Sequence, residues 1–156
     1  MSEQEKSEAQ SLVKENHETI LATTFIGQLS TVRHKDGHIS TNPVSYIWNG
    51  EELEISTLKG RMKYKNVLAN PRATLCVVSP KNHMHYVEIR GTVRVVDDTD
   101  RAYLRYQFKK LAGMDAPEDM DPPGSERVVL YLRPEQVSSP VLYGGRFDDQ
   151  GSQVAE

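Results

Sequence analysis

Apolar and polar residues alternate along much of the chain, and this period of two predicts β-strands. The predicted strands are 23–33, 38–48, 52–57, 73–79, 86–96 and 127–132, with 73–79 expected to be a buried strand. Asp36-Gly37 and Asn49-Gly50 separate successive strands and predict tight hairpins, because glycine accepts the positive φ that such turns need. Pro43 lacks an N–H for a ladder and Gly91 interrupts the alternation. We therefore expect an edge or a bulge at Pro43 and a bulge or close packing at Gly91.

Other stretches have the apolar spacing of helices, namely 8–19, 61–70 and 97–113. Strands joined mostly by hairpins, with helices inserted at a few points, predict a mainly β fold: a small antiparallel barrel with peripheral helices. We expect one domain over 8–143, a disordered N-terminus at 1–7 and a flexible C-terminal tail at 144–156.

Composition narrows the function classes. The 156 residues carry a formal net charge of −3, so a basic field for nucleic acid is not expected. Cys76 is the one cysteine and lies in an apolar run, which indicates a buried thiol and a reducing compartment. No apolar stretch has the length of a membrane span and the first residues lack a signal-peptide pattern. We therefore expect a soluble, cytoplasmic protein with no membrane partner.

The strand 52–57 runs into a basic helix start, and this junction has the chemistry of a phosphate site. Gly60 allows a sharp turn close to a ligand, and the first turn of the following helix leaves N–H groups without partners. Hydroxyls and cations gather there: Ser56, Thr57, Lys59, Arg61, Lys63 and Lys65. Such donors suit a phosphate monoester. The alternative is a solvated basic helix face that binds nothing.

Several motifs occur in a fixed order over residues 10–143. They are Leu29-Ser30-Thr31 before Asp36-Gly37, Asn42-Pro43-Val44-Ser45-Tyr46, Ser56-Thr57 with Gly60-Arg61-Met62-Lys63, Asn66-Val67-Leu68 with Asn70-Pro71-Arg72-Ala73, Tyr86 with Arg90-Gly91-Thr92-Val93, and Arg127-Val128-Val129. Together they resemble the pyridoxamine 5′-phosphate oxidase-like split-barrel superfamily, and within it the B-type flavin/deazaflavin oxidoreductases that use coenzyme F420. The resemblance implies an antiparallel split β-barrel of the FMN-binding type. The chain lacks the Arg-rich substrate segment that ends the pyridoxamine oxidases, which argues against vitamin B6 oxidation.

The resemblance also implies a homodimer with two coenzymes at its interface. Within it, the coenzyme phosphate is held by Ser56, Thr57, Lys59, Gly60, Arg61 and Lys63. The backbone of 42–46 lies along the flavin-type ring, and His85 and Tyr86 complete the pocket of the other subunit. The deazaflavin tail carries several carboxylates, and cations are available to meet it at Lys59, Lys65 and Arg33 or Lys35. This favours F420 over FMN.

Three candidate sites have simpler explanations. His83 and His85 have a chelating spacing, but no third ligand accompanies them, so we expect no metal. Tyr46 has the chemistry of a proton donor, but a packed ring with a satisfied hydroxyl is the commoner case. The acidic loop 115–121 is a lid or, more simply, a solvated connector.

The sequence thus predicts an oxidoreductase in which coenzyme F420 transfers hydride to a small conjugated or heteroaromatic substrate. Because the coenzyme performs this step, no catalytic residue is assigned. The alternatives are an FMN-dependent oxidase or reductase of the same superfamily and a non-catalytic carrier of a flavin, haem or tetrapyrrole.

Overall fold

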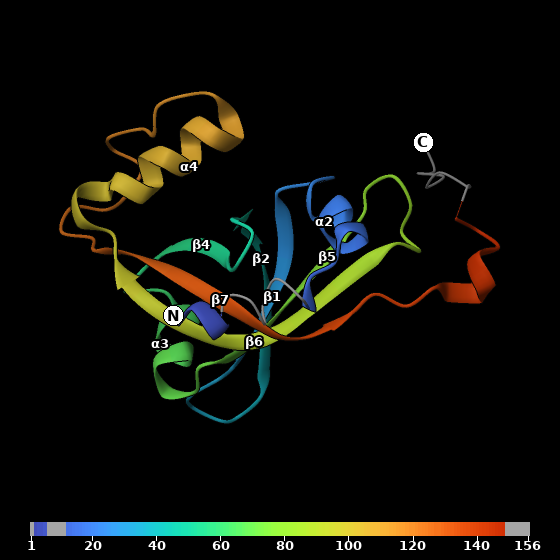
Figure 1. Ribbon diagram of the computed structural model, residues 1–156. Coiled ribbons are helices and arrows are strands. Elements are labelled where there is room, and N and C mark those ends of the chain that lie inside the picture. The colour runs from blue at the N-terminus through green and yellow to red at the C-terminus, as the bar shows by residue number, and fades with distance from the viewer. Residues whose placement is uncertain (1, 6–11, 149–156) are drawn as a thin grey trace, which may run out of the picture.

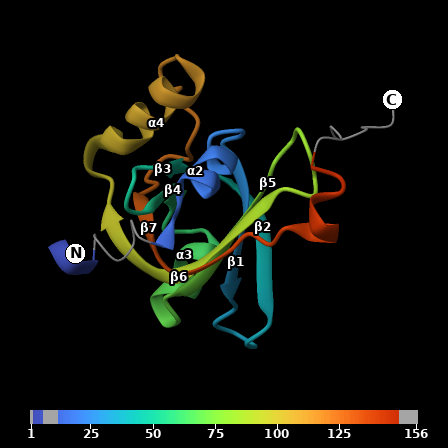
Figure 2. The same cartoon turned by 45° about the vertical axis from the view of Figure 1, so that its right-hand side comes forward.

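The computed structural model describes residues 2–5 and 12–148. Within them, seven antiparallel strands form one sheet in the order β2-β1-β5-β6-β7-β4-β3. The strands are β1 (Ile26–Val32), β2 (Ile39–Ser45), β3 (Ile47–Trp48), β4 (Leu53–Leu58), β5 (Arg72–Val78), β6 (Tyr86–Asp97) and β7 (Arg127–Ser138). The sheet curls into a half-barrel in which β2 contacts β4 (Figure 1, Figure 2). This confirms the mainly β split-barrel architecture.

The inner face of the curled sheet forms the core. Along β5, Ala73, Leu75 and Val77 are buried, whereas the residues between them are partly exposed on the outer face. The prediction of a buried strand over 73–79 is therefore correct only for alternate residues, because a strand of this sheet faces the core on one side. Large, fully buried side chains fill the half-barrel, among them Leu29, Leu53, Ile55, Leu75, Ile89, Leu130 and Leu132.

The hairpins form where the sequence predicts them. Gly37 and Gly50 have φ angles of 73° and 94° in the turns between β1 and β2 and between β3 and β4. Pro43 lies in β2, which is an edge strand of the sheet, so its missing N–H costs no ladder bond on the free side. The predicted strand 38–48 is interrupted at Tyr46, between β2 and β3.

Gly91 is required by close packing. The register of β6 against β7 shifts between Arg90 and Gly91, and a Cβ at Gly91 would lie 1.8 Å from the carbonyl oxygen of Arg133. The bulge and the close backbone approach expected there are both confirmed.

Helix α3 (Met62–Ala69) is fixed against the sheet by a buried amide. Asn66 is 0% exposed. Its Nδ2 donates to Thr31 Oγ1 at 3.1 Å, and its Oδ1 accepts from the backbone N of His34 at 3.2 Å. The helix ends before Pro71, as the sequence predicts. Its orientation, and therefore that of its first turn, depends on β1.

The other helices lie elsewhere around the half-barrel. The sequence predicts a first helix over 8–19; the structure places α2 at Glu15–Leu21, and residues 6–11 lie outside the described part. Leu12 is also helical, and a break at residues 13–14 separates it from α2, at whose start the backbone N of Lys14 donates to His17 Nδ1 at 3.1 Å. Helix α4 (Ala102–Ala112) follows the short 3-10 helix η1 (Thr99–Arg101), ends at Gly113 and extends away from the sheet (Figure 1). Within 2–5 and 12–148, no helix is both long and apolar enough to span a bilayer.

The two ends of the described chain contact the sheet region. Of the segment 1–7 predicted to be disordered, residues 2–5 are described: residues 3–5 are helical, and Glu5 accepts a hydrogen bond from Arg133 at 2.6 Å. Residues 1, 6 and 7 lie outside the described part. The 3-10 helix η2 (Leu142–Gly145) leads to Asp148, whose carboxylate lies 3.1 Å from His85 Nε2. Residues 149–156 of the predicted tail are also outside the description.

Candidate functional site

The start of α3 has an unusually positive character. Arg61 is the N-cap residue, no side chain caps the helix, and no acidic residue occurs in the first turn. The first-turn N–H groups of an uncapped helix are available to an external acceptor, and the helix dipole favours an anion there. We call Arg61, Lys63 and these N–H groups the α3 start.

Arg61 and Lys63 have no counter-ion. Within residues 2–5 and 12–148, neither side chain forms a hydrogen bond or an ion pair, and Arg61 is exposed. Lys63 is partly buried, and the pKa of its ammonium is lowered, first by this burial and then by the positive charge of Arg61. Both causes disfavour the charged lysine. A bound anion would offset both, so the arrangement fits a phosphate.

The backbone conformation at position 60 does not require a glycine. Its φ is not in the left-handed region, and an added Cβ would meet nothing within 4 Å. The sharp turn expected after the strand is present at residues 59–60, closed by a hydrogen bond from Arg61 N to Leu58 O at 3.0 Å, but it does not depend on glycine. The open space beside Gly60 nevertheless leaves room for a ligand close to the chain.

Ser56 and Thr57 do not act together as expected. Successive side chains of a strand point to opposite faces, and Thr57 is only 6% exposed on the inner face with Ile55. Ser56 points outward, where its Oγ accepts a hydrogen bond from Arg127 Nη1 at 2.8 Å. The two hydroxyls therefore cannot both reach one phosphate from the same face of β4.

Lys59 is already neutralised. Its Nζ lies 2.8 Å from Glu126 Oε2 and 3.3 Å from Asp97 Oδ1, and hydrogen bonds to these carboxylates raise its pKa. Arg33 is likewise paired with Asp36 at 2.9 Å. Two of the cations expected to meet an anionic coenzyme tail thus have acidic partners within the chain. The sequence argument that these charges favour F420 over FMN loses most of its support.

A pocket of about 570 Å³ separates the turn 58–61 from the segment Pro122–Glu126 of the α4–β7 connection. This connection is held by Arg101, whose Nη atoms donate to the carbonyls of Pro117 and Glu118. Asp121 accepts two hydrogen bonds from Arg127, at 2.7 and 2.9 Å. These contacts favour a fixed connector over a lid. Sequence reasoning missed Arg127 as part of the site, because its role depends on partners far away in sequence.

The strand expected along the coenzyme ring turns alternate residues inward. Val44 and Tyr46 are buried, and Asn42 Oδ1 is buried without a hydrogen-bond partner. The hydroxyl of Tyr46, a residue only 2% exposed, donates to the carbonyls of Leu21 and Thr24, and burial raises its pKa. Tyr46 is thus a packed ring with a satisfied hydroxyl. The flanking residues Pro43 and Ser45 face outward.

His85 and Tyr86 lie far from the α3 start in the same chain. The α3 start follows Leu58, which pairs with Arg127 beside the Asp97 end of β6. Tyr86 is at the opposite end of β6, about 35 Å away along that strand. One chain therefore does not bring them together. The part of the chain that the structure describes holds no group of three His, Cys, Asp or Glu side chains suited to a metal.

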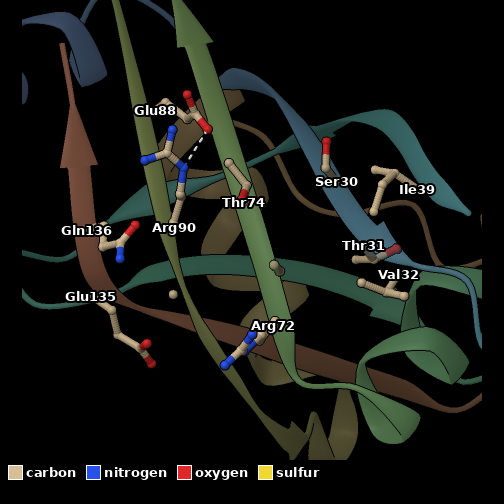
Figure 3. Close-up of a pocket in the computed structure, with 12 residues that line it drawn as sticks. Ser30, Thr31, Val32, Ile39, Arg72, Thr74, Glu88, Arg90, Glu135 and Gln136 are labelled. Carbon is tan, nitrogen blue, oxygen red and sulfur yellow. Dashed lines mark hydrogen bonds and ion pairs between the residues drawn. The ribbon is translucent and has the colours of Figure 1, made fainter. Parts of the chain in front are cut away.

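A second hollow lies on the outer face of the sheet. It measures about 530 Å³ and crosses β1, β5, β6 and β7 (Figure 3). Charged side chains of both signs surround it: Arg72, Glu88, Arg90 and Glu135. Glu88 accepts from Arg90 at 2.8 Å, and Figure 3 shows this pair beside Thr74.

Comparison with known proteins identifies the architecture. Residues 13–139 match the family Pyridoxamine 5′-phosphate oxidase. A solved F420 reductase is 32% identical, with a TM-score of 0.70 over 81% of this chain and 98% of that chain. Two further structures share the fold. One is a putative pyridoxamine 5′-phosphate oxidase from Listeria innocua, which is 19% identical with a TM-score of 0.60 over 78% of this chain and 93% of that chain. The other is a heme binding protein from Mycobacterium smegmatis, which is 21% identical with a TM-score of 0.62 over 92% of this chain and 57% of that chain. A search of curated proteins finds no match.

The family match spans every strand of the half-barrel, from β1 through β7, and both α3 and α4. It therefore includes the α3 start and the pocket beside it. Both the sequence match and the observed curl of the sheet agree with the split-barrel fold. The chain belongs to the pyridoxamine 5′-phosphate oxidase family of flavin-binding oxidoreductases.

Proposed function

We propose that this protein is an oxidoreductase that binds coenzyme F420 through its phosphate at the α3 start and passes hydride to a small conjugated or heteroaromatic substrate. One observation carries the proposal. The helix begins without a cap or an acidic residue, and the charges of Arg61 and Lys63 are not neutralised within the described chain. A phosphate at this position would accept from the free N–H groups and offset both charges.

The choice of F420 rests on similarity. A protein 32% identical over most of its length is an F420 reductase. The charges of Lys59 and Arg33 no longer support F420, because Glu126, Asp97 and Asp36 neutralise them. FMN is the alternative occupant, since it presents a phosphate of the same kind.

The residues of the chain bind and orient the coenzyme, which supplies the hydride chemistry when bound. Arg61 and Lys63 hold the phosphate. The backbone of 42–46 would lie along the ring, with the outward-facing Pro43 and Ser45 beside it. Tyr46 supports this strand from within, because its hydroxyl joins it to the end of α2.

We further propose that the functional unit is a homodimer. His85 and Tyr86 lie at the opposite end of β6 from the strand ends that lead to the α3 start, so they would meet a coenzyme only from a second subunit. The outer-face hollow supports this, because it carries both signs of charge and a two-fold interface must be complementary to itself. A cytoplasmic location remains an expectation.

A binding comparison tests the coenzyme. Purified protein is titrated with F420, followed by its fluorescence, and with FMN, followed by its absorbance. Arg61→Ala and Lys63→Met should each weaken binding by about tenfold or more, because each removes a charge-assisted contact. Lys65→Met is the matched control, since Lys65 is exposed on the same helix. Equal affinity in all four proteins would refute the α3 start as the phosphate site, and tight binding without turnover would indicate a carrier.

Subunit mixing tests the dimer. If Tyr86 serves the coenzyme of the partner, Arg61→Ala and Tyr86→Ala each damage both sites of their own homodimer. A mixed dimer then regains one intact site and recovers activity. Failure of co-refolded mixtures to recover activity would argue against a shared site.

A further inference from the structure

We propose that Arg127 is a positioning residue that keeps the α3 start available by holding the carboxylate of Asp121 away from Arg61. The inference rests on the proposed function, because it concerns the same phosphate site. In this arrangement Arg127 does not touch the ligand. It acts by occupying the acid that would otherwise neutralise Arg61.

Arg127 and Asp121 form a sheltered, bidentate pair. Their side chains are 10% and 12% exposed. Arg127 Nε and Nη2 donate to the two carboxylate oxygens at 2.7 and 2.9 Å, and Nη1 donates to Ser56 Oγ at 2.8 Å. Planar, two-bond pairs of this kind are among the stronger ion pairs in proteins. Asp121 is thus held toward β4 and β7, with its charge cancelled.

Asp121 also lies close to Arg61. It directly precedes Pro122–Glu126, the segment that faces Gly60 and Arg61 across the 570 Å³ pocket. The pKa of Asp121 is lowered mainly by its hydrogen bonds from Arg127, and the charges of Arg101 and Arg61 contribute further. Two other acids near this turn, Asp97 and Glu126, are already paired with Lys59. Asp121 is therefore the acid whose release would matter most to Arg61.

Without Arg127, the poorly solvated Asp121 needs another cation, because an unpaired charge in such a place is costly. Arg101 is a limited substitute. Its two Nη atoms already donate to carbonyl oxygens, so only its Nε, which lies 3.9 Å from Asp121 and has no hydrogen-bond partner in the described chain, remains to share the released charge. Among the described residues, Arg61 has no side-chain hydrogen bond or ion pair, so its donors remain available. The released carboxylate would pair with Arg61 and compete with any phosphate for it.

The test is a set of charge-removing variants titrated with inorganic pyrophosphate, followed by the backbone amide signals of residues 61–64. Arg127→Gln should weaken binding by about tenfold or more, since an internal carboxylate now competes for Arg61. Asp121→Asn should bind as well as the wild type or more tightly, because a negative charge is lost near the site. The double variant should recover to within about threefold of the wild type.

A purely structural role predicts a different pattern. Both single variants break the same pair, so both would then lose affinity, and the double variant would not recover. Arg94→Gln is the matched control: it breaks a bidentate pair with the buried Glu52, away from the pocket, and should leave pyrophosphate affinity unchanged. Melting temperatures confirm that each protein is folded. If Arg127→Gln does not fold, Arg127→Lys, which keeps the charge, should bind like the wild type.

Each result decides the question. The inference is overturned if Asp121→Asn binds as weakly as Arg127→Gln, if Arg127→Gln binds like the wild type, or if the double variant stays weak. Wild-type protein that binds pyrophosphate in the expected pattern but neither F420 nor FMN would refute the proposed function and leave the inference standing. Wild-type protein that does not bind pyrophosphate would refute both.

Discussion

Replacing Asn66 by alanine should loosen the helix that presents Arg61 and Lys63. Asn66 lies in the last turns of α3, is 0% exposed, and joins the helix to Thr31 of β1 and to the backbone of His34. Alanine keeps the helix propensity but removes the whole amide. The perturbation therefore acts on the attachment of α3 rather than on its formation.

The expected cost follows from the groups left behind. Thr31 is 2% exposed and loses its donor, and the N–H of His34 loses its acceptor. Leaving buried partners unsatisfied costs about 1–3 kcal/mol, and the small cavity adds about 1 kcal/mol. We expect a loss of about 2–4 kcal/mol in the free energy of unfolding, or about 4–16 °C in Tm for a chain of this size.

Urea denaturation followed by circular dichroism measures this loss, with an unchanged m-value as the sign of a native-state effect. Asn70→Ala is the control on the same helix. Within the described residues its Oδ1 accepts from the exposed backbone N of Arg72 alone, so the change in unfolding free energy should be within about 0.5 kcal/mol. Phosphate affinity should fall in Asn66→Ala and not in Asn70→Ala. If the two variants lose the same stability, the buried amide does not anchor α3 and the reasoning fails.

Three further predictions follow from the structure. Gly91→Ala should lower the free energy of unfolding by more than about 3 kcal/mol, because its Cβ would overlap the carbonyl oxygen of Arg133. Gly60→Ala has open space around the new Cβ and should lower it by no more than about 0.5 kcal/mol. Urea unfolding of the two variants measures the difference. Tyr46→Phe should lower the free energy of unfolding by about 1–2 kcal/mol, because two hydrogen bonds are lost. The rate of coenzyme turnover should not change. A slower rate with the coenzyme fully bound would instead make Tyr46 a proton donor. Burial, and then the positive charge of Lys14, lower the pKa of His17 in the folded protein below its usual 6.5. As the pH drops below 6.5, the unfolded chain therefore binds a proton at this histidine before the folded protein does, and the free energy of unfolding should fall. In His17→Gln this component of the pH dependence should disappear, as measured by unfolding free energies from about pH 8 to about pH 5.

Features that depend on a residue and its near neighbours were predictable from the sequence. Gly37 and Gly50 mark the hairpins because positive φ is a local demand, and Pro43 marks an edge strand because it lacks an N–H. The alternation of apolar residues predicts which side chains fill the half-barrel. The cluster of cations at the start of α3 is equally visible in the sequence.

Only the tertiary structure decided which of those cations are paired with acidic side chains. Lys59 and Arg61 are two residues apart, yet Lys59 is neutralised by Asp97 and Glu126, whereas Arg61 faces a pocket and has no counter-ion in the part of the chain that the structure describes. The sequence could not separate them, because the acids arrive on β6 and on the α4–β7 connection. Ion pairing depends on which distant segments become neighbours, whereas strands and turns depend on the chain itself. The sequence therefore determines the barrel and the position of a basic helix start, and the packing of β4 against β7 determines which charges remain free to hold a ligand.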